Sequence, residues 1–267
     1  MGKTLTGKVA LVTGSSKSIG QAIAVGLAEA GAAVAVIYKT DTTGAEQTCK
    51  TITDAGGNAK PFPTDIGSKV EFERAVDEVC DHFGRLDILV NNAARTRFGP
   101  IHEVTERDFD DVVNTILRGP FFGSIASAKR MNETGGGSII NISSIAVRGI
   151  MFYHGAYTVA KGGLESMTQQ MALELAPQVR VNVIAPHATS NDRNRAYDAS
   201  FDDRWAAVTP AGRVGYPKDY IGPAVFLASD AAAMVTGQII YVDGGWSLQG
   251  HAPEQGDFDY SADRERG

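Results

Sequence analysis

Residues 8–27, KVALVTGSSKSIGQAIAVGL, decide the start of the fold. The run 8–13 is short and mostly apolar, and it ends in a glycine-containing turn. The following residues, 19–27, have the apolar spacing of a helix, which Gly31 stops before a second apolar run at 33–38. This stretch therefore predicts a strand, a helix and a second strand.

Helix-like and strand-like segments alternate along the rest of the chain. The helix-like segments are 44–55, 68–83, 105–132, 155–176 and 218–228, and the strand-like segments are 59–63, 86–90, 138–142, 179–184 and 237–242. The stretch between 184 and 218 is predicted to be irregular. Continuous apolar strands that alternate with helices indicate a parallel sheet that is buried on both faces. The predicted fold class is α/β: a single-domain Rossmann fold, with a doubly wound parallel sheet of about seven strands and helices on both faces.

The chain contains no internal repeat and no linker that would divide it. We therefore expect one catalytic domain over residues 1–249. Residues 250–267 are rich in Asp, Glu, Gly and Ser, and this composition favours a polar, disordered tail. The alternative is an arm that packs on a neighbouring subunit, with Phe258 and Tyr260 as anchors.

Bulk composition excludes several classes of protein. The chain has 267 residues, 43% of them hydrophobic, and a net charge of -6, which argues against a nucleic-acid-binding protein. No segment approaches the roughly 20 apolar residues of a membrane span, and no signal peptide precedes the first strand, so we expect a cytoplasmic protein. Cys49 and Cys80 lack metal-ligand spacing and are expected to be reduced, and no metal site is predicted.

The turn Thr13-Gly14-Ser15-Ser16-Lys17-Ser18-Ile19-Gly20 lies between the first strand and the first helix. Glycine there lets the backbone approach a pyrophosphate, and the exposed amides of a helix start favour negative charge. The turn predicts a dinucleotide site. The alternative is a tight turn without a ligand.

Tyr157 and Lys161 are four residues apart in a helix-like segment. On a helix that spacing puts both side chains on one face, where the lysine charge is expected to lower the pKa of the tyrosine. A tyrosine tuned in this way can give or take a proton at a carbinol group. The alternative is two unrelated residues on a solvated helix.

Five motifs in order resemble those of the short-chain dehydrogenase/reductase family. They are Thr13-Gly14-x-x-x-Ser18-x-Gly20, Asn91-Asn92-Ala93-Ala94, Asn114, Ser144 and Tyr157-x-x-x-Lys161. The resemblance covers residues 6–248, and ordered motifs are together far more specific than any one of them. The chain departs from the family at Ser18, where glycine is usual.

The resemblance implies four catalytic residues. Tyr157 would be the general acid for carbonyl reduction or the base for alcohol oxidation, and Lys161 would lower its pKa and hold the nicotinamide ribose. Ser144 would hydrogen-bond the substrate oxygen, and Asn114 would anchor a water that relays protons to Lys161. Ser143 is the competing serine, but the family's usual gap to the tyrosine favours Ser144.

The resemblance also implies a nicotinamide cofactor, whose adenine would lie beside Asp65 and Ile66. Asn92 would lie under the adenosine ribose, and Thr189 would contact the nicotinamide amide. The full set of expected cofactor-binding residues is Gly14, Ser16, Lys17, Ser18, Ile19, Gly20, Tyr38, Lys39, Asp65, Ile66, Asn92, Ala93, Tyr157, Lys161, Pro186 and Thr189.

Charge at the end of the second strand predicts the choice of cofactor. An NAD enzyme would carry an acidic residue there for the ribose 2'-hydroxyl, but the position is occupied by Tyr38. Lys17 and Lys39 would instead meet a 2'-phosphate with positive charge. We therefore expect NADP in preference to NAD, although Asp41 lies close enough to weaken that preference.

Two departures from the family pattern concern the substrate. The family commonly has Pro-Gly after the sixth strand, whereas this chain has Pro186-His187, followed by a markedly polar loop. Three loops that carry arginines are expected to open on one crevice at the carboxyl ends of the strands. There the arginines would suit an anionic or polyhydroxylated substrate. The candidate substrate residues are Arg95, Arg148, His154, His187 and Arg193, with Arg97 beside them. The alternative is surface arginines that pair with nearby acids.

The sequence thus predicts an NADP-dependent enzyme that interconverts a ketone and a secondary alcohol, on a small, polar substrate. Lys129, Arg130 and Arg180 suggest a 3-oxoacyl-carrier-protein reductase-like activity as one alternative. A non-catalytic NADP(H)-binding regulatory module is another. Helices over 105–132 and 155–176 match those that the family uses to form homotetramers, so we expect this assembly.

Overall fold

The computed structural model describes residues 3–97 and 99–248. In these ranges seven parallel strands form one sheet, in the order β3-β2-β1-β4-β5-β6-β7. The strands are β1 (Val9–Thr13), β2 (Ala33–Tyr38), β3 (Ala59–Pro63), β4 (Ile88–Asn91), β5 (Gly137–Ile142), β6 (Val179–Pro186) and β7 (Ile239–Val242). The strand order reverses between β1 and β4, where open α/β sheets form their ligand crevice. The predicted fold class is confirmed.

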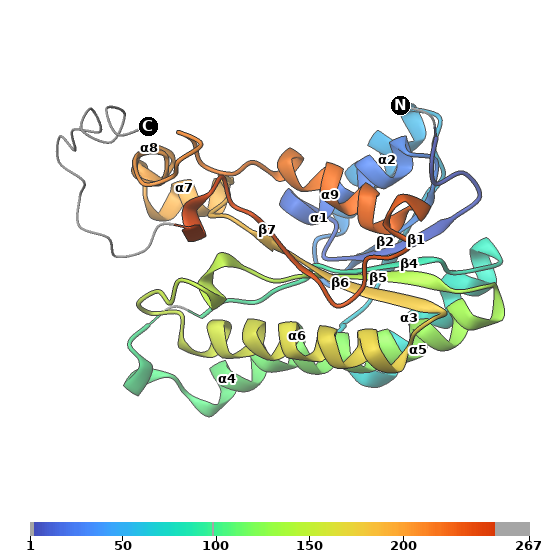
Figure 1. Cartoon of the computed structure of the whole chain (residues 1–267), viewed down its shortest axis with the longest axis horizontal. Coiled ribbons are helices and arrows are strands. Elements are labelled where there is room, and N and C mark those ends of the chain that lie inside the picture. The colour runs from blue at the N-terminus through green and yellow to red at the C-terminus, as the bar shows by residue number, and fades with distance from the viewer. Residues whose placement is uncertain (1–2, 98, 249–267) are drawn as a thin grey trace, which may run out of the picture.

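Helices cover both faces of the sheet (Figure 1). On one face lie α1 (Ser18–Glu29), α2 (Thr42–Asp54) and α9 (Ile221–Ala228). On the other face lie α3 (Lys69–Phe83), α4 (Glu106–Val113), α5 (Gly119–Glu133) and α6 (Gly155–Glu174). Two short helices, α7 (Asp192–Tyr197) and α8 (Phe201–Ala207), lie together beyond one end of the sheet, at the left in Figure 1.

Strand β1 shows why the sheet is buried on both faces. Its side chains alternate between two hydrophobic cores. Ala10 and Val12 pack in the core beneath α1, α2 and α9, whereas Val9 and Leu11 pack in the core beneath α3, α5 and α6. Because both faces need apolar side chains, the strand is a continuous apolar run instead of an alternating one.

The prediction of one helix over 105–132 is wrong in one respect, because a π-helical turn, Asn114–Arg118, separates α4 from α5. Pro120 has no N–H to donate to the carbonyl of Ile116, so the regular α-helical ladder is interrupted there. Gly119 also packs against the backbone, since a Cβ on it would lie 2.0 Å from the carbonyl oxygen of Ile66.

The prediction of an irregular stretch between 184 and 218 is also wrong, because it contains α7 and α8. Helices of 6 and 7 residues are too short to show a helical period in the sequence. The predicted helix 218–228 begins as a 3₁₀ turn, Pro217–Tyr220, before α9.

The predicted tail, 250–267, lies outside the described residues. In the ranges that the structure does describe, none of the helices has the length and apolar character needed to cross a membrane. The same ranges hold no group of three or more His, Cys, Asp or Glu side chains arranged for a metal ion.

A candidate active site at the carboxyl ends of the strands

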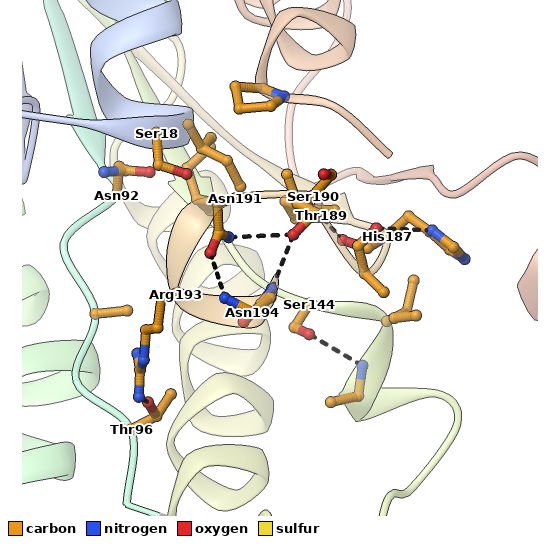
Figure 2. Close-up of a pocket in the computed structure, with 18 of the residues that line it drawn as sticks. Ser18, Asn92, Thr96, Ser144, His187, Thr189, Ser190, Asn191, Arg193 and Asn194 are labelled. Carbon is orange, nitrogen blue, oxygen red and sulfur yellow. Dashed lines mark hydrogen bonds between the residues drawn. The ribbon is translucent and has the colours of Figure 1, made fainter. Parts of the chain in front are cut away.

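A cavity of about 1270 Å³ lies at the carboxyl ends of the central strands (Figure 2). The glycine-containing turn after β1 lines one part of it, and the loops after β4 and β5 line its middle. Residues of α6, the end of β6, and helices α7 and α8 complete the wall. The cavity is therefore at the switch point of the sheet, where open α/β sheets bind their ligands.

Glycine is required at two positions of the turn by close contacts. Gly14 has a φ of +62°, and a Cβ on it would lie 2.9 Å from Cα of Ala93. A Cβ on Gly20 would lie 2.3 Å from Nδ2 of Asn92. That Nδ2 group donates hydrogen bonds to the backbone oxygens of Thr13 and Gly14, at 2.9 and 3.1 Å. The loop after β4 thus holds the glycine-containing turn in place.

Thr13 organises this contact, a role that the sequence analysis missed. Its hydroxyl oxygen accepts hydrogen bonds from the backbone N–H groups of Asn92 and Ala93, at 2.9 and 3.0 Å, and donates to the carbonyl of Val90 at 3.2 Å. The side chain is fully buried. The signal in the sequence was a lone hydroxyl residue that ends an apolar strand.

Ser18 lines the cavity and has a φ of +52°, in the left-handed region. Glycine adopts this conformation without a Cβ penalty, which accounts for the family's usual glycine at this position. Ser18 is the first residue of α1, and Lys17 before it gives the helix no side-chain cap. The first amides of α1 are therefore available to an anion in the cavity.

Ser144, Tyr157 and Lys161, three of the four predicted catalytic residues, all line the cavity. The Ser144 hydroxyl accepts a hydrogen bond from the backbone N–H of Ala146 at 3.1 Å, which leaves its own proton for another oxygen. The Ser143 hydroxyl donates its proton to Glu165 at 2.6 Å, so this proton is not available to a substrate. The geometry thus favours Ser144 over Ser143 as the serine that serves the cavity.

The pKa of Tyr157 differs in direction from the sequence-based prediction. Removal of the phenol from water raises its pKa, while a hydrogen bond with Ser144 and the charge of Arg193 oppose this rise. Burial lowers the pKa of Lys161 to about 7, and the charge of Glu165 opposes that change. The ammonium lies 5.6 Å from the centroid of the Tyr157 ring and donates a hydrogen bond to the carbonyl of Ile142. Desolvation is the largest cause of the shift for both groups.

Asn114 is the first residue of the π-helical turn between α4 and α5. This turn packs against α6, which carries Tyr157 and Lys161. Asn114 does not belong to the described lining of the cavity. A π-helical turn at this place is typical of functional sites, and the role of Asn114 in a proton relay stays a prediction.

Most of the expected cofactor residues line the cavity. They are Gly14, Ser16, Lys17, Ser18, Ile19, Gly20, Asn92, Ala93, Tyr157, Lys161, Pro186 and Thr189. Thr189 is held by a hydrogen bond from its hydroxyl to the carbonyl of His187, at 2.8 Å, and by a contact of 2.7 Å with the hydroxyl of Tyr220.

The other expected cofactor residues, Tyr38, Lys39, Asp65 and Ile66, lie beyond the described lining, around the end of β2. Lys39 donates to the carboxylate of Asp65. Lys17 forms a second ion pair, 3.6 Å from the carboxylate of Asp41. The two lysines that were expected to favour NADP therefore each have an acidic neighbour.

Two of the expected substrate residues, His154 and Arg193, line the cavity. The His154 ring is 6.1 Å from the Tyr157 ring, and its Nδ1 lies 2.7 Å from the carbonyl of Phe152. Arg193 projects from α7 toward Thr96, to which it donates a hydrogen bond (Figure 2). The contact between Arg193 and Thr96 joins α7 to the loop after β4.

His187, also predicted, is buried in the wall of the cavity. Its Nδ1 lies 3.0 Å from the carbonyl of Ala188, and its Nε2 lies 3.1 Å from the hydroxyl of Thr209. The ring contacts Trp205 of α8 edge to face, at 5.3 Å between centroids. Burial lowers the pKa of His187, mainly by desolvation. The residue therefore helps to seat α8.

Arg95 and Arg148, also predicted as substrate residues, do not belong to the described lining of the cavity. Arg95 pairs with Asp111 of α4 at 3.2 Å, and Arg97 pairs with Asp108 of the same helix at 3.1 Å. Arg148 lies over the ring of Tyr241, 5.2 Å from its centroid. Acidic residues on α4 thus hold the loop arginines. Among the described residues that line the cavity, Arg193 is the one arginine.

The basic residues that suggested an acyl-carrier partner do not form a common patch beside the cavity. Arg130 donates to Asp77 at 2.7 Å and also pairs with Glu133. Arg180 donates to the backbone carbonyl of Ser229 at 3.2 Å. Neither these two nor Lys129 belongs to the described lining.

Helices α7 and α8 add side chains that the sequence analysis did not assign. Asn191 and Asn194 both donate to the carbonyl of Thr189, at 3.1 and 2.8 Å, and so tie α7 to the end of β6 (Figure 2). Phe201 and Trp205 give this part of the cavity an aromatic wall. The polar loop in the sequence was the available signal. The two helices in it are too short for a helical pattern to show which side chains face the cavity.

Known proteins resemble this chain over most of its length. A family model described as enoyl-(acyl carrier protein) reductase matches residues 14–247. The chain is 37% identical to D-threitol dehydrogenase of Mycolicibacterium smegmatis, over 92% of this chain and 95% of that one. It is 39% identical to 2-dehydro-3-deoxy-D-gluconate 5-dehydrogenase of Escherichia coli, over 91% and 96%. A crystal structure of gluconate 5-dehydrogenase from Burkholderia cenocepacia, in complex with NADP and tartrate, has a TM-score of 0.87 and 34% identity, over 93% and 98%.

Proposed function

The chain belongs to the short-chain dehydrogenase/reductase family, and we propose that it is an NADP-dependent enzyme that interconverts a ketone and a secondary alcohol in a small polyhydroxylated substrate. One observation carries the proposal. Ser144, Tyr157 and Lys161 line the same cavity as the glycine-containing turn, so proton-transfer groups and a phosphate-binding element serve one space.

The turn fits the pyrophosphate of a dinucleotide. Side chains at Gly14 and Gly20 would collide with neighbouring atoms, so the backbone itself faces the cavity. The uncapped amides of α1 would meet the negative charge. At the other end, Lys161 and Thr189 would hold the nicotinamide riboside. When bound, the nicotinamide supplies or accepts the hydride.

NADP is proposed over NAD because of the charges near the end of β2. Tyr38 replaces the carboxylate that would repel a 2'-phosphate. The Asp41 carboxylate accepts a hydrogen bond from the backbone N–H of Gly44 at 3.1 Å and pairs with Lys17. The pKa of Asp41 is lowered by a hydrogen bond with Ser16 and by the hydrogen bond from Gly44. The carboxylate is therefore ionised, and the charge of Lys17 offsets its negative charge. NADP in the related gluconate 5-dehydrogenase structure supports the same choice.

The chain's own part of the reaction is proton transfer at the substrate oxygen. In reduction Tyr157 gives its proton to the oxygen that becomes the alcohol, and the Ser144 hydroxyl stabilises the charge that develops there. The phenol is protonated at neutral pH, but its raised pKa makes it a weaker acid, so proton transfer depends on groups that stabilise the phenolate. The Lys161 ammonium then stabilises the phenolate that remains. In oxidation the same groups act in reverse.

A polyhydroxylated substrate is supported by the far end of the cavity. Arg193, His154 and Thr96 give this part of the cavity polar side chains, with the His154 ring 6.1 Å from that of Tyr157, and Trp205 offers an aromatic face. Such a mixture suits hydroxyl and carboxylate groups on a short carbon chain. The relatives named for threitol and for deoxygluconate chemistry point to the same class of substrate.

The test is a panel of polyols, sugar acids, simple ketones and acyl thioesters, with turnover followed by NADPH absorbance. Tyr157→Phe should lower kcat at least about a hundredfold, because it removes the proton donor, while the Kd of NADPH stays within about threefold of wild type. Tyr153→Phe, the same change at an exposed tyrosine in the preceding loop, is the matched control.

Near-normal turnover by Tyr157→Phe would refute the mechanism. Tight NADPH binding without turnover of any compound on the panel would favour a non-catalytic module instead. Preference for acyl thioesters over polyols would refute the proposed substrate class.

A further inference from the structure

Glu165 is a buried carboxylate that the mechanism above does not use. It lies on α6, one turn beyond Lys161, and its side chain is almost inaccessible, with a relative exposure of 7%. Buried carboxylates are rare unless other groups compensate for their charge. The position therefore calls for a role.

The two side chains of α6 hold two consecutive residues at the end of β5. Lys161 donates to the backbone carbonyl of Ile142, and Glu165 accepts from the hydroxyl of Ser143 at 2.6 Å. Ser143 is fixed further by its backbone N–H, which donates to the carbonyl of Ile184 at 2.8 Å. The next residue is Ser144, whose hydroxyl faces the cavity.

Charge links Glu165 to Lys161 as well. No direct ion pair joins them in the part of the chain that the structure describes, but their charges lie one helical turn apart in an interior that screens them weakly. Burial lowers the pKa of Lys161, and the carboxylate opposes this change. In turn, burial raises the pKa of Glu165, while the hydrogen bond from Ser143 and the charge of Lys161 hold it down.

The other ionisable groups near Glu165 are on neighbouring elements. Tyr241 of β7 faces it: burial raises the pKa of this phenol, and the Glu165 charge raises it further. Arg148 lies over the Tyr241 ring, and Asp243 acts on that ring from the end of the same strand. Of these groups, Lys161 is the cation that takes part in the proposed reaction, so the Glu165 charge matters for catalysis through Lys161.

We propose that Glu165 is a positioning residue for the proposed reaction: through Ser143 it fixes the strand end that carries Ser144, and through its charge it keeps Lys161 protonated. The inference rests on the proposed function for its catalytic meaning. Its physical content is the protonation of Lys161 and can be measured without a substrate.

The experiment measures the protonation midpoint of Lys161 by NMR of protein labelled with ¹³C at the lysine ε-carbon, with Lys161→Met to assign the signal. The midpoint of the wild type should be about 7. Glu165→Gln keeps an oxygen that can accept from Ser143 but removes the charge, so it should lower the midpoint by about one pH unit. Glu165→Asp keeps the charge and should lie closer to the wild type. Glu174→Gln, the same change at an exposed position of α6, should leave the midpoint in place.

Turnover gives the second measurement. In Glu165→Gln the alkaline limb of the kcat profile for ketone reduction should move to lower pH by the same amount, with the KM of NADPH changed less than kcat. A midpoint and a kcat profile that both match the wild type would overturn the inference. If Glu165→Gln shifts the Lys161 midpoint but the wild type turns over no substrate, this inference holds and the proposed function is refuted. If the wild type turns over substrate but Glu165→Gln leaves the midpoint unshifted, the proposed function holds and this inference is refuted.

Discussion

Single residues fix the dinucleotide end of the cavity, and Gly20 is the clearest case. It lies where α1 leaves the turn, and the space that a side chain would need is filled by the amide of Asn92 and the carbonyl of Gly14, the latter 2.4 Å from a Cβ. The same amide braces the turn through its hydrogen bonds to the backbone. Turn shape and Asn92 position are therefore coupled.

Gly20→Ala should destabilise the protein by about 1–3 kcal/mol, because both neighbours must move to admit the methyl group. It should also weaken NADPH binding at least about tenfold, because the amides of the turn move with them. Urea denaturation and NADPH titration measure the two effects. Gly222→Ala is the matched control, because no atom lies within 4 Å of its added Cβ. Equal effects in both variants would contradict the proposed fit.

Lys17 and Lys39 are the two residues expected to set the preference for NADP over NAD. Both are exposed and each pairs with a single carboxylate, so their removal should cost little stability. The double variant Lys17→Ala/Lys39→Ala should weaken NADPH by about tenfold or more but leave NADH nearly unchanged, because only NADPH carries the 2'-phosphate. Titrations of both cofactors give the ratio of Kd values. Lys50→Ala, at an exposed site of α2, is the control, and an unchanged ratio in the double variant would exclude the proposed cofactor choice.

At the scale of elements, the starts of β1 and β4 are joined by one buried carboxylate. Asp87 is 2% exposed and accepts the backbone N–H of Val9 at 2.9 Å. Arg85 binds both of its oxygens, at 2.8 and 2.6 Å, and Lys8 lies 3.4 Å away. The charges are thus compensated at the rim of the sheet opposite to the cavity.

Asp87→Ala should lower the free energy of unfolding by about 2–4 kcal/mol, because the N–H of Val9 loses its partner and the two cations remain together. Urea denaturation measures the loss. Asp54→Ala breaks an exposed ion pair with Lys50 and should change stability by less than about 0.5 kcal/mol. If the two variants were equally stable, the buried carboxylate would have no special role in joining the strands.

At the scale of the whole molecule, α4, α5 and α6 leave apolar side chains exposed on one side of the sheet. They include Phe109, Phe121, Val159 and Leu173, of which Leu173 is 77% exposed. The sequence predicted self-association through these helices, and exposed apolar groups are consistent with it.

We expect a tetramer in solution, and Leu173→Asp should shift it to smaller species, because the interface would have to bury a charge. Sedimentation equilibrium measures the mass. Val70→Asp, at an equally exposed position of α3, should leave the assembly intact. A wild-type protein that sediments as a monomer would disprove the expectation.

The sequence by itself determined the fold class and singled out Ser144, Tyr157 and Lys161, all of which line the cavity. The physical reason is that these features depend on local patterns: buried parallel strands are continuous apolar runs, and the residues singled out stand in short motifs that follow one another in order.

Only the tertiary structure decided which polar groups meet. The carboxylates of α4 hold Arg95 and Arg97 away from the cavity, whereas Arg193 reaches toward it from α7, a helix too short to predict. The direction of the Tyr157 pKa likewise depends on how much water the packed chain excludes, and the pairing of Glu165 with Ser143 joins residues 22 positions apart. Such partners depend on distances across the fold, which no local pattern encodes.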